Sequence, residues 1–142
     1  MRWQLLVARV RAAWRHYHSL AQRGERAAAR YLRRRGYKIV GRHERDTYGE
    51  LDLIAVDGRT VVFVEVKTRR SHDAGHPAEA VGPDKQRRMT RMALAYLKRH
   101  ELLECKARFD VLALTWPKHA RRPKIEHIRN AFEAVGKGQM FS

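Results

Sequence analysis

The sequence predicts a fold of the α/β class, built on a sheet that is covered on both faces. Two β-rich runs, Leu51–Val56 and Arg59–Lys67, flank the dipeptide Asp57-Gly58, which is typical of a two-residue hairpin turn. Apolar residues occupy both alternating sets of positions in these runs, which indicates strands buried on both faces. Amphipathic helical segments precede and follow the hairpin, and they supply the covering layers.

Helical periodicity dominates the first 35 residues. Residues 1–23 contain five arginines and no acidic residue, and their apolar residues recur at helical spacing. They predict a basic amphipathic helix with one apolar stripe: Trp3, Leu6, Val7, Val10, Ala13, Trp14, Tyr17 and Leu20. Residues 24–35 predict a second helix, which Gly36 ends as a C-cap. A short strand is expected at 37–40, and the polar stretch 41–49 is expected to be a loop or a ragged strand.

The elements after the hairpin follow from turn residues and periodicity. Residues 68–82 are rich in Arg, His, Gly and Pro and are expected to form a loop. Pro83 suits the first turn of a helix that is expected to reach about Arg99. The remaining expectations are, in order, a strand at Arg108–Thr115, a basic loop at 116–123, a short strand at Ile125–Ile128 and a frayed tail at 134–142. The 142 residues suit one domain, which we place at residues 24–133.

Composition excludes several classes of protein. No apolar run approaches the roughly 20 residues of a membrane-spanning helix. The N-terminus lacks the pattern of a secretory signal, because arginines interrupt its apolar stretch. The single cysteine, Cys105, cannot form an internal disulfide. The sequence therefore predicts a soluble, cytoplasmic protein without a transmembrane segment.

The charge balance points to a polyanionic partner. The chain has 31 Lys and Arg against 15 Asp and Glu, for a net charge of +16, and 23 of the basic residues are arginine. Such a field concentrates polyanions, and the guanidinium group suits phosphate, so nucleic acid is the expected partner. Residues 1–23 leave three interpretations open. The helix could pack on the domain's own core, lie on an anionic membrane, or follow a nucleic-acid backbone.

The hairpin gathers charged residues at its open end. With Asp57-Gly58 as the two loop residues, Val56 pairs with Arg59 and Asp52 lies opposite Phe63. Four charged side chains then project from one face toward the open end: Glu50, Asp52, Glu65 and Lys67. This grouping depends on the register, since a one-residue slip would move one strand's side chains to the other face.

A divalent cation would relieve the repulsion among these carboxylates. Mg²⁺ prefers oxygen ligands and is typically held by one or two carboxylates together with water and a substrate phosphate. The metal lowers the pKa of a bound water, and Lys67 beside that water could position it for attack on a phosphodiester. The alternative interpretation is a charged sheet rim with ordinary cross-strand pairs.

The spacing Asp52…Glu65-Val66-Lys67 resembles the Asp…Glu-x-Lys signature of the PD-(D/E)XK nuclease superfamily. The chain is similar, more closely, to the YraN-type family of that superfamily, which is related to archaeal Holliday-junction resolvases. The similarity extends from Gly24 to Phe132. Its segments are Gly24–Leu32, Gly36-Tyr37, Gly49–Ala55, Val62–Arg69, Pro77–Val81, Lys85–Arg88, Phe109–Val111 and Ile125–Phe132.

The resemblance implies a restriction-endonuclease-like α/β/α core with a central mixed sheet, preceded by the N-terminal helix. It implies that Asp52 and Glu65 bind Mg²⁺ or Mn²⁺ and that Lys67 is the catalytic lysine. It also implies Glu25 as a further metal ligand and Gln86 as a polar helical residue of the catalytic site. The chain departs from RecB-type relatives at Thr90, where they carry tyrosine. Glu50 matches the family motif without an implied role.

The function expected from these features is hydrolysis of phosphodiester bonds in DNA, including branched or flapped DNA. DNA is favoured over RNA, and junction-resolving relatives act as dimers, so a second copy of the chain is a candidate partner. The expected backbone contacts are Arg69, Arg70, Lys85, Arg87, Arg88 and Arg91. Two other interpretations are a nucleic-acid-binding protein that keeps the fold without cleaving, and a membrane-surface or protein-interaction adaptor.

Overall fold

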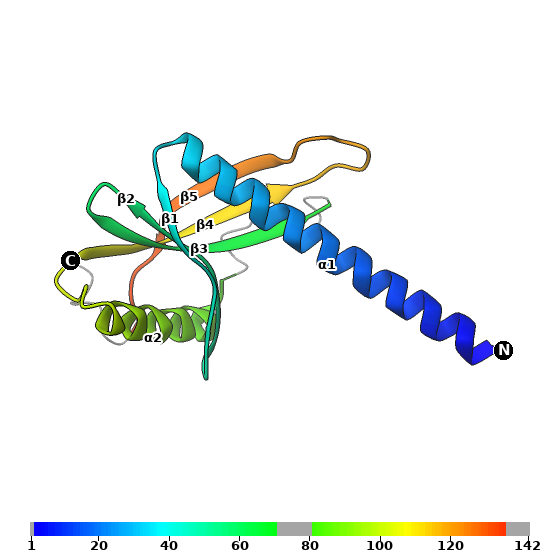
Figure 1. The fold of residues 1–142 in the computed structure, drawn as a ribbon, viewed down its shortest axis with the longest axis horizontal. Coiled ribbons are helices and arrows are strands. Elements are labelled where there is room, and N and C mark those ends of the chain that lie inside the picture. The colour runs from blue at the N-terminus through cyan, green and yellow to red at the C-terminus, as the bar shows by residue number, and fades with distance from the viewer. Residues whose placement is uncertain (1, 71–80, 136–142) are drawn as a thin grey trace.

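The computed structural model of the chain describes residues 2–70 and 81–135, and for residues 13–19 the backbone alone (Figure 1). Most of the expected loop at 68–82 and most of the expected frayed tail therefore lie outside the described residues. The elements of the described part are α1 (Arg2–Arg34), β1 (Lys38–Asp46), β2 (Gly49–Asp57), β3 (Thr60–Arg69), α2 (Pro83–Arg99), β4 (Lys106–Thr115) and β5 (Lys124–Phe132).

The five strands form one mixed sheet in the order β1-β2-β3-β4-β5. Strands β3 and β4 are parallel and the other neighbours are antiparallel. A parallel pair requires a crossover, and α2 lies in that connection. Figure 1 shows α1 and α2 on different sides of the sheet. The predicted α/β class, with a central mixed sheet between helices and a helix at the N-terminus, is confirmed.

Two apolar cores fill the spaces between the sheet and the helices. Ile54 and Phe63 belong to the core on the α2 side, with Met89 and Leu97 of that helix. The next residue on each strand faces the other way, so Leu53 and Val64 join Ala28 and Leu32 of α1. The expectation of strands buried on both faces is therefore confirmed, and it explains why the hairpin sequence is apolar almost throughout.

The predicted break between two helices at Gly24 is wrong. The expected helices at 1–23 and 24–35 are one helix of 33 residues. A glycine inside a helix costs only about 1 kcal/mol relative to alanine, so it need not end the helix. Gly24 is buried against β3, and a Cβ atom there would lie 1.9 Å from the Oγ1 atom of Thr68. The glycine therefore serves close packing of helix on sheet rather than a break.

The edge strands are longer than predicted. The stretch expected as a short strand and then a loop or ragged strand is the single strand β1, whose pairing shifts between Ile39 and Gly41. Strand β5 continues to Phe132, past the predicted end at Ile128, and its pairing also shifts near this end. His43 and Asn130 adopt positive φ angles of 51°. Such irregular edges deter pairing with further strands.

The hairpin register differs from the prediction by two residues. The loop is Gly58-Arg59, so Val56 pairs with Val61 rather than with Arg59, and Ile54 pairs with Phe63. Gly58 has a φ angle of 62°, which suits the first central position of a type II′ turn. Because the shift is even, every side chain stays on its predicted face.

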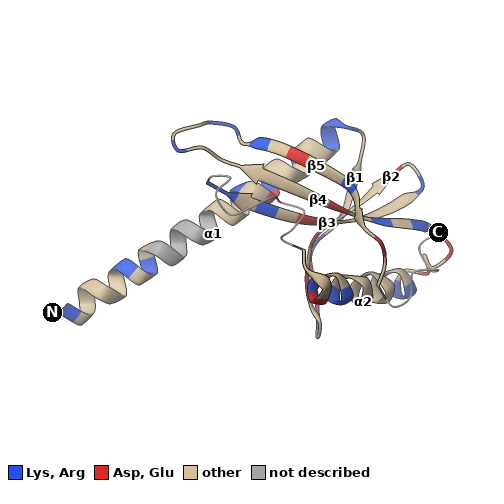
Figure 2. Ribbon diagram, turned by 180° about the vertical axis from the view of Figure 1, so that it is seen from behind, with Lys and Arg blue, Asp and Glu red and all other residues tan. Residues whose placement is uncertain are grey.

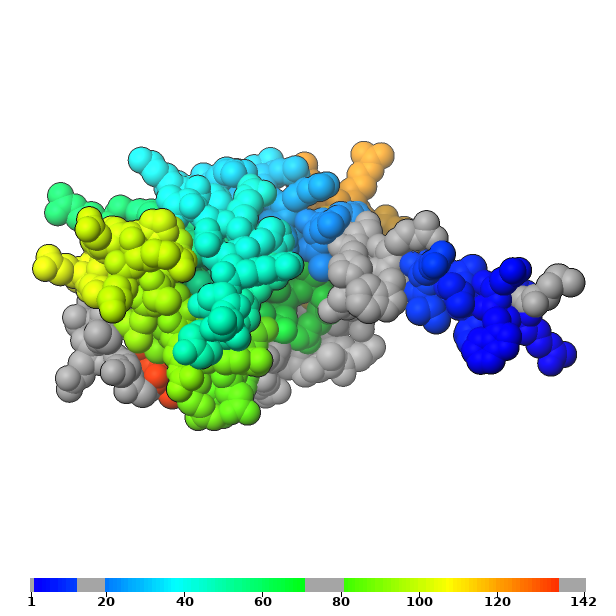
Figure 3. All heavy atoms as spheres, turned by 60° about the horizontal axis from the view of Figure 1, so that its bottom comes forward, coloured from blue at the N-terminus to red at the C-terminus, as the bar shows by residue number. Residues whose placement is uncertain are grey.

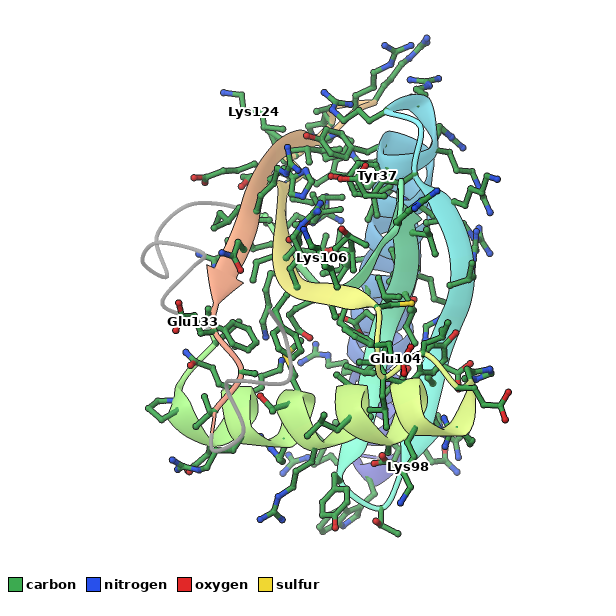
Figure 4. All side chains as sticks on the ribbon, turned by 90° about the vertical axis from the view of Figure 1, so that its left-hand side faces the viewer. Tyr37, Lys98, Glu104, Lys106, Lys124 and Glu133 are labelled. Carbon is green, nitrogen blue, oxygen red and sulfur yellow. The ribbon has the colours of Figure 1, made fainter. Side chains whose placement is uncertain are left out.

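A buried polar network ties β4 to β5 at the end of the sheet where Tyr37 lies, away from α2 (Figure 4). Asp110 is fully buried, and its carboxylate accepts hydrogen bonds from Arg108 Nε at 3.0 Å and from the Asn130 amide at 2.9 Å. His127 Nε2 lies 2.8 Å from the second carboxylate oxygen. Arg108 also donates to the Tyr37 hydroxyl at 2.8 Å. Burial would raise the pKa of Asp110, but these hydrogen bonds outweigh it and lower that pKa.

The first turns of α1 stand clear of the rest of the chain in the space-filling view (Figure 3). Residues 2–12 are all exposed, whereas Arg23 lies over the buried Trp116 ring at 4.2 Å.

We expect a chain that begins at Ala13 to keep the wild-type thermal midpoint within roughly 2 °C, because no described buried contact is lost. A chain that begins at Gly24 should melt at a lower temperature, since it lacks Arg23, which covers the buried Trp116 ring. Thermal unfolding followed by circular dichroism measures both. Equal losses would show that residues 2–12 contribute to the fold.

Candidate metal and nucleic-acid site

The candidate site lies where β2 separates from β3. Pairing between these strands ends at Leu53–Val64, although β3 continues to Arg69 and β2 stays paired with β1 back to Gly49. Asp52 is the first residue of β2 beyond the last pair. Its Oδ2 atom accepts a hydrogen bond from the Val66 amide at 2.8 Å, which satisfies a β3 donor in place of a ladder bond. The separation therefore opens the sheet at the carboxylates that the sequence singled out.

Glu65 is buried, with 4% of its surface exposed, and it forms ion pairs with two lysines. Lys67 Nζ lies 3.6 Å from its Oε1 atom, and Lys85 Nζ donates a hydrogen bond to the same oxygen. Lys85 comes from the first turn of α2, whereas Lys67 follows Glu65 on β3. The sequence predicted Lys85 as a backbone contact and did not place it at Glu65. Lys85 is one of several basic residues in α2, and their spacing does not indicate which of them contacts a carboxylate on the sheet.

Electrostatic forces in this cluster oppose one another. Burial, followed by repulsion from Glu65, raises the pKa of Asp52 to about 7, against the Val66 hydrogen bond and the attraction of Lys85. Burial and the nearby Lys85 ammonium lower the pKa of Lys67. Burial would also lower the pKa of Lys85, but its hydrogen bond to Glu65 prevails and raises it. The cluster thus holds a carboxylate whose charge is poorly compensated, which is the condition that a bound cation would relieve.

Glu25 of α1 lies in a separate chain of contacts at the rim. Its Oε2 atom is 2.7 Å from His43 Nε2, and His43 Nδ1 is 2.6 Å from Glu50 Oε1. Arg45 Nε donates to the other Glu50 oxygen at 3.0 Å. Glu50 thus has a structural partner in the imidazole that links it to Glu25. His43 could not be predicted from the sequence, because a single histidine in a polar stretch shows neither periodicity nor motif.

The other predicted site residues lie around this cluster. The Gln86 side-chain amide donates to the Val81 carbonyl at 2.9 Å, which ties Gln86 to the segment before α2. Arg87 pairs with Asp84, Arg91 lies 5.3 Å from the centre of the Tyr48 ring, and Arg88 is exposed. Arg69 and Arg70 follow Lys67 along and beyond β3, and both take part in interactions. Figure 2 shows blue basic segments along α2, the helix that carries Lys85.

The donor set fits a cation that keeps much of its own hydration. Within residues 2–70 and 81–135, no three acidic, histidine or cysteine side chains are gathered closely enough to enclose a metal. Asp52 and Glu65 offer carboxylate oxygens at one place, and their mutual repulsion favours a positive ion between them. Mg²⁺ is commonly bound by one or two carboxylates, with water and substrate phosphate completing the octahedron. The site therefore suits Mg²⁺ or Mn²⁺ better than a structural zinc.

The raised pKa of Asp52 makes a prediction about stability without divalent ions. A carboxyl that holds its proton more tightly in the folded state stabilises the protein below its unfolded pKa, near 4. That stability is lost as the pH rises toward about 7. Thermal midpoints in EDTA should therefore fall between pH 5 and pH 8. Asp52→Asn should melt higher than wild type at pH 8, on the order of 5 °C, and the gap should narrow at pH 5. A constant gap across this range would contradict the assignment.

Comparisons with known proteins place most of this chain in one family. A family model described as Uncharacterised protein family UPF0102 matches residues 24–114. A UPF0102 protein of Rhodopirellula baltica is 51% identical over 120 residues, which are 82% of this chain and 72% of the relative. A UPF0102 protein of Geobacter sulfurreducens is 51% identical over 118 residues, or 83% of this chain and 91% of the relative. The region matched by the family model begins at Gly24 and contains every predicted site residue.

Proposed function

We propose that this chain, which belongs to the uncharacterised family UPF0102, is a metal-dependent nuclease that hydrolyses phosphodiester bonds in DNA. Membership of that family confirms the YraN-type assignment of the sequence analysis. The observation that carries the proposal is the convergence of Asp52, Glu65 and Lys67 where β2 leaves β3. The resemblance of this trio to the Asp…Glu-x-Lys signature supports a place in the PD-(D/E)XK superfamily.

The residues divide the chemistry among them. Asp52 and Glu65 hold Mg²⁺ or Mn²⁺, with Glu25 at the rim as a further carboxylate. When bound, the metal supplies a water of lowered pKa and neutralises charge on the phosphoryl oxygens. Lys67, whose own pKa is lowered by burial and by Lys85, positions the attacking water and stabilises the charge that develops during attack. The buried apolar residues beside the pair keep the site's dielectric low, which strengthens these interactions.

Basic residues close to the carboxylates supply affinity for the substrate backbone. Arg87, Arg88 and Arg91 follow Lys85 along α2, and Arg69 and Arg70 follow Lys67. Branched or flapped DNA is the favoured substrate on the family resemblance, and a homodimer is the proposed assembly on the same ground.

A second function, nucleic-acid binding without cleavage, is favoured by one observation. Two lysines already lie within ion-pair distance of Glu65, so this carboxylate has counter-ions without metal.

Binding to nucleic acid should depend strongly on salt. The net charge of +16 and the arginines of α2 predict contacts to several phosphates, each of which releases counterions. We expect duplex affinity to fall by about 10³ or more between 50 and 200 mM salt if six or more phosphates are contacted. Fluorescence anisotropy with labelled duplex in EDTA measures binding separately from cleavage. An affinity that is flat over this range would exclude electrostatic backbone binding.

A cleavage panel tests the proposed activity. Linear, flapped and four-way DNA and the matching RNA are incubated with wild type, Lys67→Ala and Lys98→Ala, in Mg²⁺, Mn²⁺ or EDTA. We expect wild type and Lys98→Ala to cleave DNA only with metal, and Lys67→Ala to bind without cleaving. Lys98 is a suitable control because it lies exposed near the end of α2, on the side away from the sheet (Figure 4). Binding by all three proteins without cleavage of any substrate would support the second function instead.

A further inference from the structure

Lys85 contacts the buried carboxylate of Glu65, which the proposed function assigns to the metal. The buried Glu65 Oε1 atom accepts a hydrogen bond from Lys85, and Lys67 lies farther from the same atom, at 3.6 Å. Lys85 reaches this oxygen from α2, across the core from the strand that carries Glu65. The contact is therefore a tertiary one, made by a side chain of a different layer.

Glu65 already has two cationic partners without metal. The ammonium groups of Lys67 and Lys85 both lie within ion-pair distance of its Oε1 atom. A divalent ion bound at Glu65 would place two further positive charges beside Lys85. At a separation of a few ångströms this repulsion is several times the thermal energy, even in a partly polar medium. Metal and Lys85 therefore compete for the same carboxylate oxygen.

We propose that Lys85 is an internal counter-ion of Glu65 that a divalent cation must displace, and that it thereby sets the metal affinity of the site. This inference rests on the metal site of the proposed function. Lys85 is suited to the exchange because its ammonium is a compact charge on a flexible stem and its side chain is only partly buried, with 30% exposed. Once displaced, the ammonium lies beside the site where a substrate phosphate would bind, so metal and phosphate binding favour each other.

Calorimetric titration of Mn²⁺ into the full-length protein tests the competition directly. Lys85→Met should bind Mn²⁺ on the order of tenfold more tightly than wild type, because the competing charge is gone. Lys98→Met on the same helix removes an equal charge away from the site and should keep the wild-type affinity within about twofold. Lys85→Arg keeps a cation and should not gain affinity. Metal-free Lys85→Met should melt lower than wild type, and Mn²⁺ should raise its midpoint by more.

The outcomes separate this inference from the proposed function. Equal affinity in wild type and Lys85→Met, with binding lost in Asp52→Asn, would overturn the displacement and leave the metal site standing. Weaker binding by Lys85→Met would also overturn it, since Lys85 would then support the metal site. No Mn²⁺ binding by any variant would overturn the metal site and the proposed function together. If Lys85→Met does not fold, Lys85→Gln provides the same comparison with a polar side chain.

Discussion

Asp52→Asn is expected to abolish metal-dependent cleavage and to weaken Mn²⁺ binding by about 100-fold or more. Asparagine keeps the shape of the side chain and an oxygen that can accept the Val66 hydrogen bond, so the fold should persist. It removes the charge that the proposed function assigns to cation binding. The loss of several kcal/mol of transition-state stabilisation corresponds to a rate reduction of about 10³ or more.

Nucleic-acid binding should survive this change or improve, because a negative charge near the phosphates is gone. Asp84→Asn is a matched control, since Asp84 lies exposed at the start of α2 and pairs with Arg87. Calorimetry with Mn²⁺ and cleavage of labelled DNA measure the two effects. Equal metal affinity in wild type and Asp52→Asn would remove Asp52 from the ligand set.

Asp110→Ala should produce the largest loss of stability, about 3–5 kcal/mol. Removing the carboxylate takes from Arg108 and His127 their shared partner and leaves Arg108 with Asp57, which is more exposed than Asp110. Loss of one member of a buried ion pair costs about this much. The Asn130 amide, at the irregular end of β5, also loses its acceptor. Denaturant unfolding measures the change, and the exposed Glu104 supplies the control variant Glu104→Ala (Figure 4).

Asp110→Asn distinguishes hydrogen bonding from charge in this network. It keeps one acceptor oxygen, so its stability should lie between that of wild type and Asp110→Ala. Because the pKa of Asp110 is lowered in the folded protein, its contribution is present at neutral pH and is lost as the pH falls below the unfolded value near 4. The gap between wild type and Asp110→Asn should therefore close in acid. A gap below about 1 kcal/mol at pH 7 for Asp110→Ala would mean that the network contributes little.

The faces of the hairpin could be predicted from sequence because burial on both sides leaves a clear local pattern. The register could not, since Asp57-Gly58 and Gly58-Arg59 are both acceptable turns and the choice depends on the pairing of whole strands. The error was an even number of residues, so Asp52 and Glu65 were still assigned to the correct faces. The continuity of α1 was missed because Gly24 suits both a helix end and a close contact.

The partners of individual charges were the least predictable part of the site. Lys85 and His43 contact carboxylates on other elements, at positions fixed only when the layers pack. The hydrogen bond from Gln86 to the Val81 carbonyl could not be predicted either, because a local sequence pattern does not show which group a side-chain amide contacts. Signatures in the sequence thus identified the carboxylates, whereas the groups that neutralise them required the tertiary structure.

The continuity of α1 restricts the shape of anything that covers its exposed half. Leu6 is five helical turns from Gly24, and Val10 is five turns from Ala28, so the exposed apolar side chains lie in line with those that pack on the sheet. They therefore face the side on which the domain lies. A flat leaflet laid along the whole helix would collide with the sheet unless the helix bends. The geometry of the helix therefore leaves room beside its apolar stripe for a narrow, rod-like surface. A broad planar surface that followed the whole helix would not fit.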